Sequence, residues 1–94
     1  GYLAAEATTT GANNVAVGAS ALLVNTTGAS NTALGHLALS ANTTGIYNIA
    51  IGRNALLTNI TTNNNVAVGY AALKVNVVAD NTAVGTNSLQ VAIT

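Results

Sequence analysis

Apolar and polar positions follow one another in the same order along the whole chain. A short apolar stretch follows an asparagine and ends at a glycine, and a second apolar pair then leads into a polar turn. Self-similarity at a fixed period indicates a repeat architecture. The repeat asparagines are Asn14, Asn31, Asn48, Asn65 and Asn81, at intervals of 17, 17, 17 and 16 residues. The matching glycines are Gly18, Gly35, Gly52, Gly69 and Gly85.

The first apolar stretch of each repeat predicts a short strand. With the repeat asparagine counted as the first place, the second and fourth places hold branched residues such as Val15 and Val17, with Ala16 between them. Side chains alternate across a strand, so one face carries branched bulk and the other only methyl groups. We expect a second chain to approach this methyl face closely and make it a subunit contact.

The rest of the repeat predicts a turn, a second strand and another turn. Glycine in the fifth place suits a turn with positive φ or a close backbone approach. An Ala-Leu pair in the eighth and ninth places, such as Ala21-Leu22, predicts a second short strand, and Asn-Thr-Thr-Gly at residues 25–28 and 42–45 closes the repeat. A helix is the competing interpretation, but about seven residues between glycine and asparagine are too few for a stable one.

The predicted fold class is therefore all-β, a parallel β-roll or β-solenoid with coils of about 17 residues. Stacked coils lie about 4.8 Å apart, so each side chain lies over its counterpart in the next repeat. Residues 1–94 are predicted to be a single array of about five and a half repeats. We expect this array to be a fragment of a longer fibre.

Composition adds the expectation of a partner chain. Apolar residues make up 50% of the chain, but only 4% of the residues are charged, which protects a lone domain poorly against association. The large apolar side chains are mostly Leu, Val and Ile, so the core must be thin. A basic stripe for nucleic acid is absent, and so is an apolar run near the ~20 residues of a membrane helix. We therefore expect self-association, with no nucleic-acid binding and no membrane insertion.

The repeat cores NNVAVG, SNTALG, YNIAIG and DNTAVG resemble the head repeats of YadA-like trimeric autotransporter adhesins. A longer 17-residue form, NTAVGY-x-AL followed by NTTG, is common in phage tail-fibre-like proteins, and the stretch NVAVGYAAL at residues 65–73 resembles it most closely here. The repeat length departs from that of the YadA head. The resemblance implies a left-handed parallel β-roll in a homotrimer, intertwined or side by side. It also implies a structural shaft or head that attaches to a surface, located outside the cell, on the cell surface or on a virion.

Candidate chemistry is sparse, and the residues predict no enzyme, no metal site and no cofactor. His36 is the only histidine, and the two carboxylates, Glu6 and Asp80, lie several repeats apart, so they cannot work as an acid–base pair. The sixth place varies from repeat to repeat, which is typical of a solvated rim. It is also the best candidate for a contact column toward a host-surface glycan or protein. The same place holds Ala19 and Thr86, and the predicted contact residues, called the sixth column below, are Tyr2, His36, Arg53 and Tyr70.

Two further interpretations of the polar turns stay open. Asn25, Asn42 and Asn59 match the N-glycosylation sequon, although repeated turns produce the same spacing. The threonines, among them Thr27 and Thr44, form columns in a stacked coil, so the alternative function is a single-chain β-solenoid that binds ice or another ordered surface. Adjacent threonines in a turn fit this poorly, because an ordered array needs Thr-x-Thr on one strand face.

Overall fold

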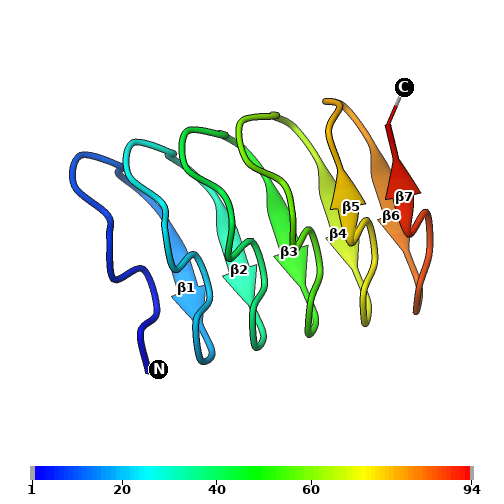
Figure 1. Ribbon diagram of the computed structural model, residues 1–94, viewed down its shortest axis with the longest axis horizontal. Coiled ribbons are helices and arrows are strands. Elements are labelled where there is room, and N and C mark those ends of the chain that lie inside the picture. The colour runs from blue at the N-terminus through cyan, green and yellow to red at the C-terminus, as the bar shows by residue number, and fades with distance from the viewer. Residues whose placement is uncertain (1, 94) are drawn as a thin grey trace.

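Short strands stack in register along the long axis of the molecule (Figure 1). The computed structural model describes residues 2–93, with principal extents of 30 × 22 × 16 Å. Coils one to five comprise residues 14–30, 31–47, 48–64, 65–80 and 81–93, and residues 2–13 end the preceding coil. The strands are β1 (Val15–Val17), β2 (Thr32–Leu34), β3 (Ile49–Ile51), β4 (Val66–Val68), β5 (Val75–Asn76), β6 (Thr82–Val84) and β7 (Val91–Ala92).

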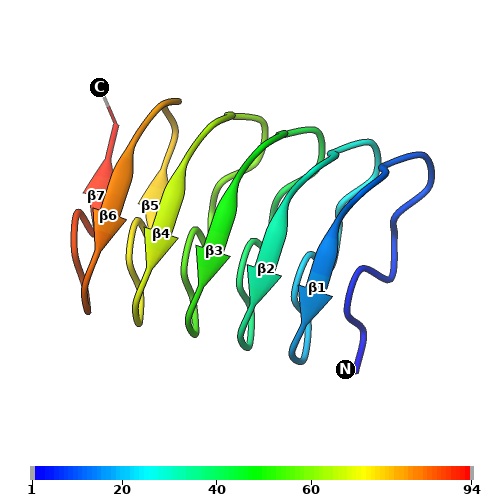
Figure 2. The ribbon, with the colours of Figure 1, turned by 180° about the vertical axis from the view of Figure 1, so that it is seen from behind.

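One five-stranded parallel sheet runs the length of the stack in the order β1-β2-β3-β4-β6. Equivalent residues pair directly, so Ala33 lies opposite Ala16 on one side and Ala50 on the other. This confirms the predicted all-β, parallel solenoid with coils of about 17 residues. In Figure 2 the strands of this sheet lie on the near side and run downward, while the chain advances from right to left. The winding is therefore left-handed, and Figure 1 shows the same winding from behind.

The alanine face of this sheet is the interior of the coil. Ala33, Ala50 and Ala67 have no exposed surface in the single chain, and they pack into one core with the leucine column formed by Leu22, Leu39, Leu56 and Leu73. The prediction that the methyl face is a subunit contact is therefore wrong. A coil this narrow has room for leucine from one side only, so the opposite side supplies methyl groups. The branched residues point outward.

The predicted second strand is mostly a series of turns. Among residues 2–93, only β5 and β7 pair on that side, as a two-stranded sheet. Leu22 and its equivalents have positive φ, 51° at Leu22 and 50° at Leu56, and the seventh place does too, with 62° at Ser20. These conformations break an extended run. They also turn successive amides toward opposite neighbours, since the Leu37 N–H donates to Ala19 at 3.0 Å and the Leu39 N–H donates to Ala55 at 3.0 Å.

The buried leucines offset an unfavourable backbone conformation. A left-handed conformation costs a non-glycine residue about 1–2 kcal/mol. Complete burial of a leucine side chain contributes about 1.5–3 kcal/mol, and Leu39 and Leu56 are fully buried. Positive φ and complete burial coincide at Leu22, Leu39, Leu56 and Leu73, so the cost and its compensation occur at the same residue.

Two ladders of buried asparagines fill the rest of the interior. In the first, the Asn31 Nδ2 group donates to the Gly45 carbonyl at 2.8 Å, and its Oδ1 atom accepts the backbone N–H of Asn48 at 2.9 Å. In the second, Asn42 donates to Asn25 Oδ1 at 2.9 Å and accepts from Asn59 Nδ2 at 3.1 Å. Each amide thus serves its own coil and a neighbouring one. Buried amides satisfied in this way tie the coils together along the axis.

Candidate interaction surface

The outer face of the five-stranded sheet is a largely apolar strip whose side chains are exposed or half-buried in the single chain. Figure 2 looks onto this face, which extends across β1, β2, β3, β4 and β6. The exposed fraction is 51% at Val15, 43% at Leu34 and 66% at Val84. The residues of this outer strip are Val15, Val17, Thr32, Leu34, Ile49, Ile51, Val66, Val68, Thr82 and Val84. None of them carries a charge, and continuous apolar surface of this kind marks interaction sites.

The alternation of the sequence predicts both faces of the strand, but the predicted contact with a second chain was placed on the alanine face and not on this strip. Alternation alone separates branched residues from alanines without saying which of them faces inward. Leucine in the ninth place resolves the ambiguity, because its four fully buried side chains already occupy the width of the coil. The residues that sequence reasoning missed as a surface are therefore the second- and fourth-place aliphatics.

The sixth column lies at the edge where the strands end, directly after the fifth-place glycines. Tyr2, His36, Arg53 and Tyr70 are exposed, as expected for a solvated rim. Hydrogen bonds align their backbones in a column, because the carbonyls of His36 and Arg53 accept the N–H groups of Asn54 and Ala71 in the next coil at 3.0 and 2.9 Å. The column therefore presents His36, Arg53 and Tyr70 from three successive coils, on a fixed backbone.

The sequon asparagines lie inside the coil. The side chains of Asn25, Asn42 and Asn59 have no exposed surface, and each Nδ2 group donates to a carbonyl of its own turn, as Asn25 does to Gly28 at 2.9 Å. Glycosylation joins the sugar to this nitrogen. A glycan at these positions is incompatible with the folded coil.

The threonine columns lie in turns and not on a flat strand. Thr27, Thr44 and Thr61 are exposed, one from each successive coil. Their neighbours Thr26 and Thr43 use their hydroxyls within the stack, where Thr26 Oγ1 donates to the Thr43 carbonyl at 3.2 Å. One exposed file remains, and it lacks the Thr-x-Thr arrangement that the ordered-surface alternative needs.

The histidine and the two carboxylates, Glu6, His36 and Asp80, come from separate coils. Within residues 2–93, no three His, Cys, Asp or Glu side chains form a cluster that could hold a metal ion. Glu6 lies before coil one and Asp80 at the end of coil four, and both are exposed. The described part of the chain forms no helix that is long and apolar enough to cross a membrane.

Comparison of the chain with protein-family models, with curated proteins and with solved structures finds no match. Inference about function consequently starts from the surfaces of the molecule.

Proposed function

We propose that the chain is a structural segment of a homotrimeric fibre, the shaft or head of a surface adhesin or of a phage tail fibre. The observation that carries the proposal is the uncovered apolar strip on the outer sheet face (Figure 2). Its work is mechanical, to project or attach an outer end at a cell surface or on a virion. The stacked asparagines and the parallel ladder supply stiffness along the axis.

A partner copy covers the outer strip better than water does. Burial of apolar surface contributes about 25 cal/mol per Å², and the strip carries no charge that would have to lose its hydration. The chain has two cations and two carboxylates in total, so few like charges oppose close packing of copies. Copies pack side by side through branched residues in this arrangement. The number three comes from the resemblance to trimeric repeat proteins.

The test is the solution mass over a range of concentrations, measured by sedimentation or light scattering. The native chain is expected to be a trimer, and the double variant Val17→Thr and Leu34→Thr is expected to be a folded monomer. Threonine already occupies this face at Thr32 and Thr82, so the strands tolerate it. Ile60→Thr is the control, because Ile60 is an exposed aliphatic residue outside the sheet and threonine occupies its place in the two preceding coils.

Three outcomes decide the proposal. A trimer that is lost in the strip variant and kept in the control supports it. A native monomer at all concentrations contradicts it and favours a single-chain solenoid with its exposed threonine file. A trimer that survives in the strip variant places the contact on another face.

Attachment is assigned to the sixth column in this proposal. Exposed aromatic, histidine and arginine side chains are suited to stacking and hydrogen bonding with a glycan or a protein surface. A paired His36→Ala and Arg53→Ala variant is expected to keep the mass of the native chain and to bind a glycan array more weakly. Thr44→Ala, on the opposite edge, is the control. Equal binding by both variants would remove the column from the proposal.

A further inference from the structure

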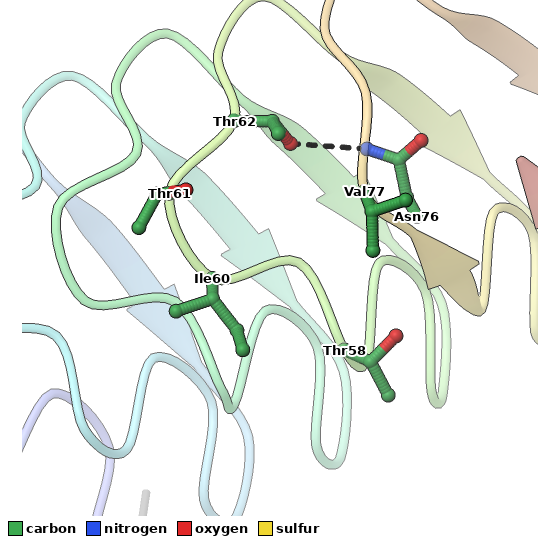
Figure 3. A pocket seen from close by; sticks show the side chains of 6 residues that line it. All are labelled: Thr58, Ile60, Thr61, Thr62, Asn76 and Val77. Carbon is green, nitrogen blue, oxygen red and sulfur yellow. Dashed lines mark hydrogen bonds between the residues drawn. The ribbon is translucent and has the colours of Figure 1, made fainter. Parts of the chain in front are cut away.

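Coil four is one residue shorter than the coils before it, and the shortening opens a pocket. The turn at 76–80 has five residues where the preceding turn, 59–64, has six. A half-open pocket of about 330 Å³ lies between these turns (Figure 3). It is lined by Thr58, Ile60, Thr61, Thr62, Asn76 and Val77. This volume is at the lower end of the range for small-molecule sites.

The earlier turns show what normally occupies this position. The backbone N–H groups of Thr26, Thr27 and Gly28 all donate to the carbonyl oxygen of Thr43 in the next coil, at 3.0, 3.2 and 3.0 Å. One coil earlier, the amides of Thr9, Thr10 and Gly11 converge on the Thr26 oxygen in the same way. Each of these two turns is thus a nest of three amides around a single acceptor oxygen supplied by the following coil. In the next turn, the amides of Thr43 and Thr44 donate to the Ile60 oxygen at 2.8 and 3.4 Å.

The nest at residues 60–62 lacks its acceptor. Among the backbone hydrogen bonds of residues 2–93, none joins the amides of residues 60–62 to the turn at 76–80. The shortened turn makes other bonds, since Asn76 Nδ2 donates to Thr62 Oγ1 at 3.1 Å and the Val77 N–H donates to Ala92 at 3.0 Å. The amides of Ile60, Thr61 and Thr62 are expected to face the pocket, because the amides at the same places in the turns at 9–11 and 26–28 point toward the next coil.

We propose that this pocket binds a small carboxylate that carries a branched apolar group. A carboxylate oxygen takes the place of the missing carbonyl, because convergent backbone N–H groups bind anions. The half-exposed side chains of Ile60 and Val77 flank the pocket and cover the apolar part of the ligand. The backbone of Lys74, one of the chain's two cationic residues, adjoins the pocket, since its carbonyl accepts the N–H of the lining residue Thr58 at 3.1 Å.

The chemistry fits either a free short-chain acid or the C-terminal carboxylate of a peptide that ends in an aliphatic residue. The site does not depend on the proposed fibre, because it lies on the turn edge and not on the outer strip. Loss of the trimer therefore leaves this inference standing, and loss of binding leaves the fibre proposal standing.

The experiment is an amide-detected NMR titration of the native chain with isovalerate, acetate, isovaleramide and inorganic phosphate, each into the millimolar range. We expect saturable shifts of the Ile60, Thr61 and Thr62 amides with isovalerate, weaker shifts with acetate and phosphate, and none with neutral isovaleramide. The amides of Thr26, Thr27 and Gly28 are an internal control, because their acceptor is present. A peptide ending in Val with a free carboxylate, compared with its amide, distinguishes the two ligand sources.

A matched variant restores the missing residue by placing the sequence of residues 59–64 in the position of residues 76–80. The turn then supplies its own carbonyl, so isovalerate binding is expected to be lost while the circular dichroism stays that of the native chain. The proposal is overturned by an absence of saturable shifts at 60–62, by equal shifts at 26–28, or by undiminished binding in the restored turn. The internal control decides the question even if the restored variant does not fold.

Discussion

At the scale of single residues, the buried asparagines have no freedom to change. Asn42 is fully buried and makes three side-chain hydrogen bonds, to Asn25, Asn59 and the carbonyl of Gly45. An aliphatic side chain of similar size would leave these partners without hydrogen bonds inside the coil. Buried polar groups without partners each cost about 1–3 kcal/mol.

Asn42→Ala is therefore expected to lower the free energy of unfolding by roughly 2–4 kcal/mol. Thr44→Ala, in the same turn but exposed, is expected to change it by less than about 0.5 kcal/mol. Urea titration followed by circular dichroism measures both. Similar values for the two variants would mean that the second ladder contributes little to stability.

The fifth-place glycines combine two constraints that a pair of variants separates. Gly35 has φ of 134°, and a Cβ atom on it would lie 2.7 Å from the carbonyl carbon of Gly52. Gly85 has φ of 123°, yet its Cβ would meet nothing closer than Ser88 at 3.8 Å. Gly85→Ala thus tests the backbone conformation alone, and Gly35→Ala adds the clash.

We expect Gly85→Ala to cost about 1–3 kcal/mol from conformation. Gly35→Ala is expected to cost about 1–3 kcal/mol more, because the neighbouring coil must move away. Thermal melting of the two variants side by side gives the difference. Equal melting temperatures would show that the coils separate easily at this edge.

At the scale of elements, each strand has a narrow inner side and an open outer one. The inner alanines of β2, β3 and β4 pack with the leucine column, whereas the outer residues meet no part of the chain's own core. A strand in this fold therefore tolerates change in the second and fourth places and resists it in the third.

Ala50→Leu is expected to destabilise the single chain by about 1–3 kcal/mol or more, because the added atoms overpack the coil. Ile51→Leu, on the outer side of the same strand, keeps its volume and is expected to cost less than about 1.5 kcal/mol. Urea unfolding at a concentration where the chain is monomeric checks both. If Ala50→Leu affected only association, the alanine face would be a subunit contact after all.

At the scale of the whole molecule, stability is a sum over coils and the contacts between adjacent coils. Nearly every hydrogen bond between coils links residues 15 to 18 positions apart, in the backbone as in the asparagine ladders. The fold therefore depends on a constant sequence separation between bonded residues of adjacent coils, and no single long-range contact defines it.

Deletion of residues 32–48 joins Asn31 to Ile49 and preserves this phase. We expect a folded solenoid one coil shorter, with a lower melting temperature and the same shape of circular dichroism spectrum. Deletion of residues 40–48 alone shifts the phase and is expected to give a protease-sensitive chain. Equal protease resistance of the two deletions would contradict a stack held by its repeat.

The period, the parallel pairing and the thin core were predictable from the sequence, because stacked coils require equivalent residues at a fixed interval. The positive φ of the leucines was not, since leucine rarely adopts it and no neighbour marks it. The asparagine of the second ladder was taken for a turn residue. Asn76 indicated a structural role for this place in the repeat, because asparagine is kept there although the rest of the turn has changed.

The sequence by itself thus determined the architecture, because the 17-residue interval and the alternation of branched residues with alanine leave few ways to pair strands. Only the tertiary structure decided which face lies inside, because both faces of the strand are apolar and only the width of the closed coil distinguishes leucine from alanine. It also decided that the one-residue shortening of coil four opens a pocket. The shortened turn does not supply a hydrogen-bond acceptor to the turn of the preceding coil, so the effect appears one coil away from the missing residue.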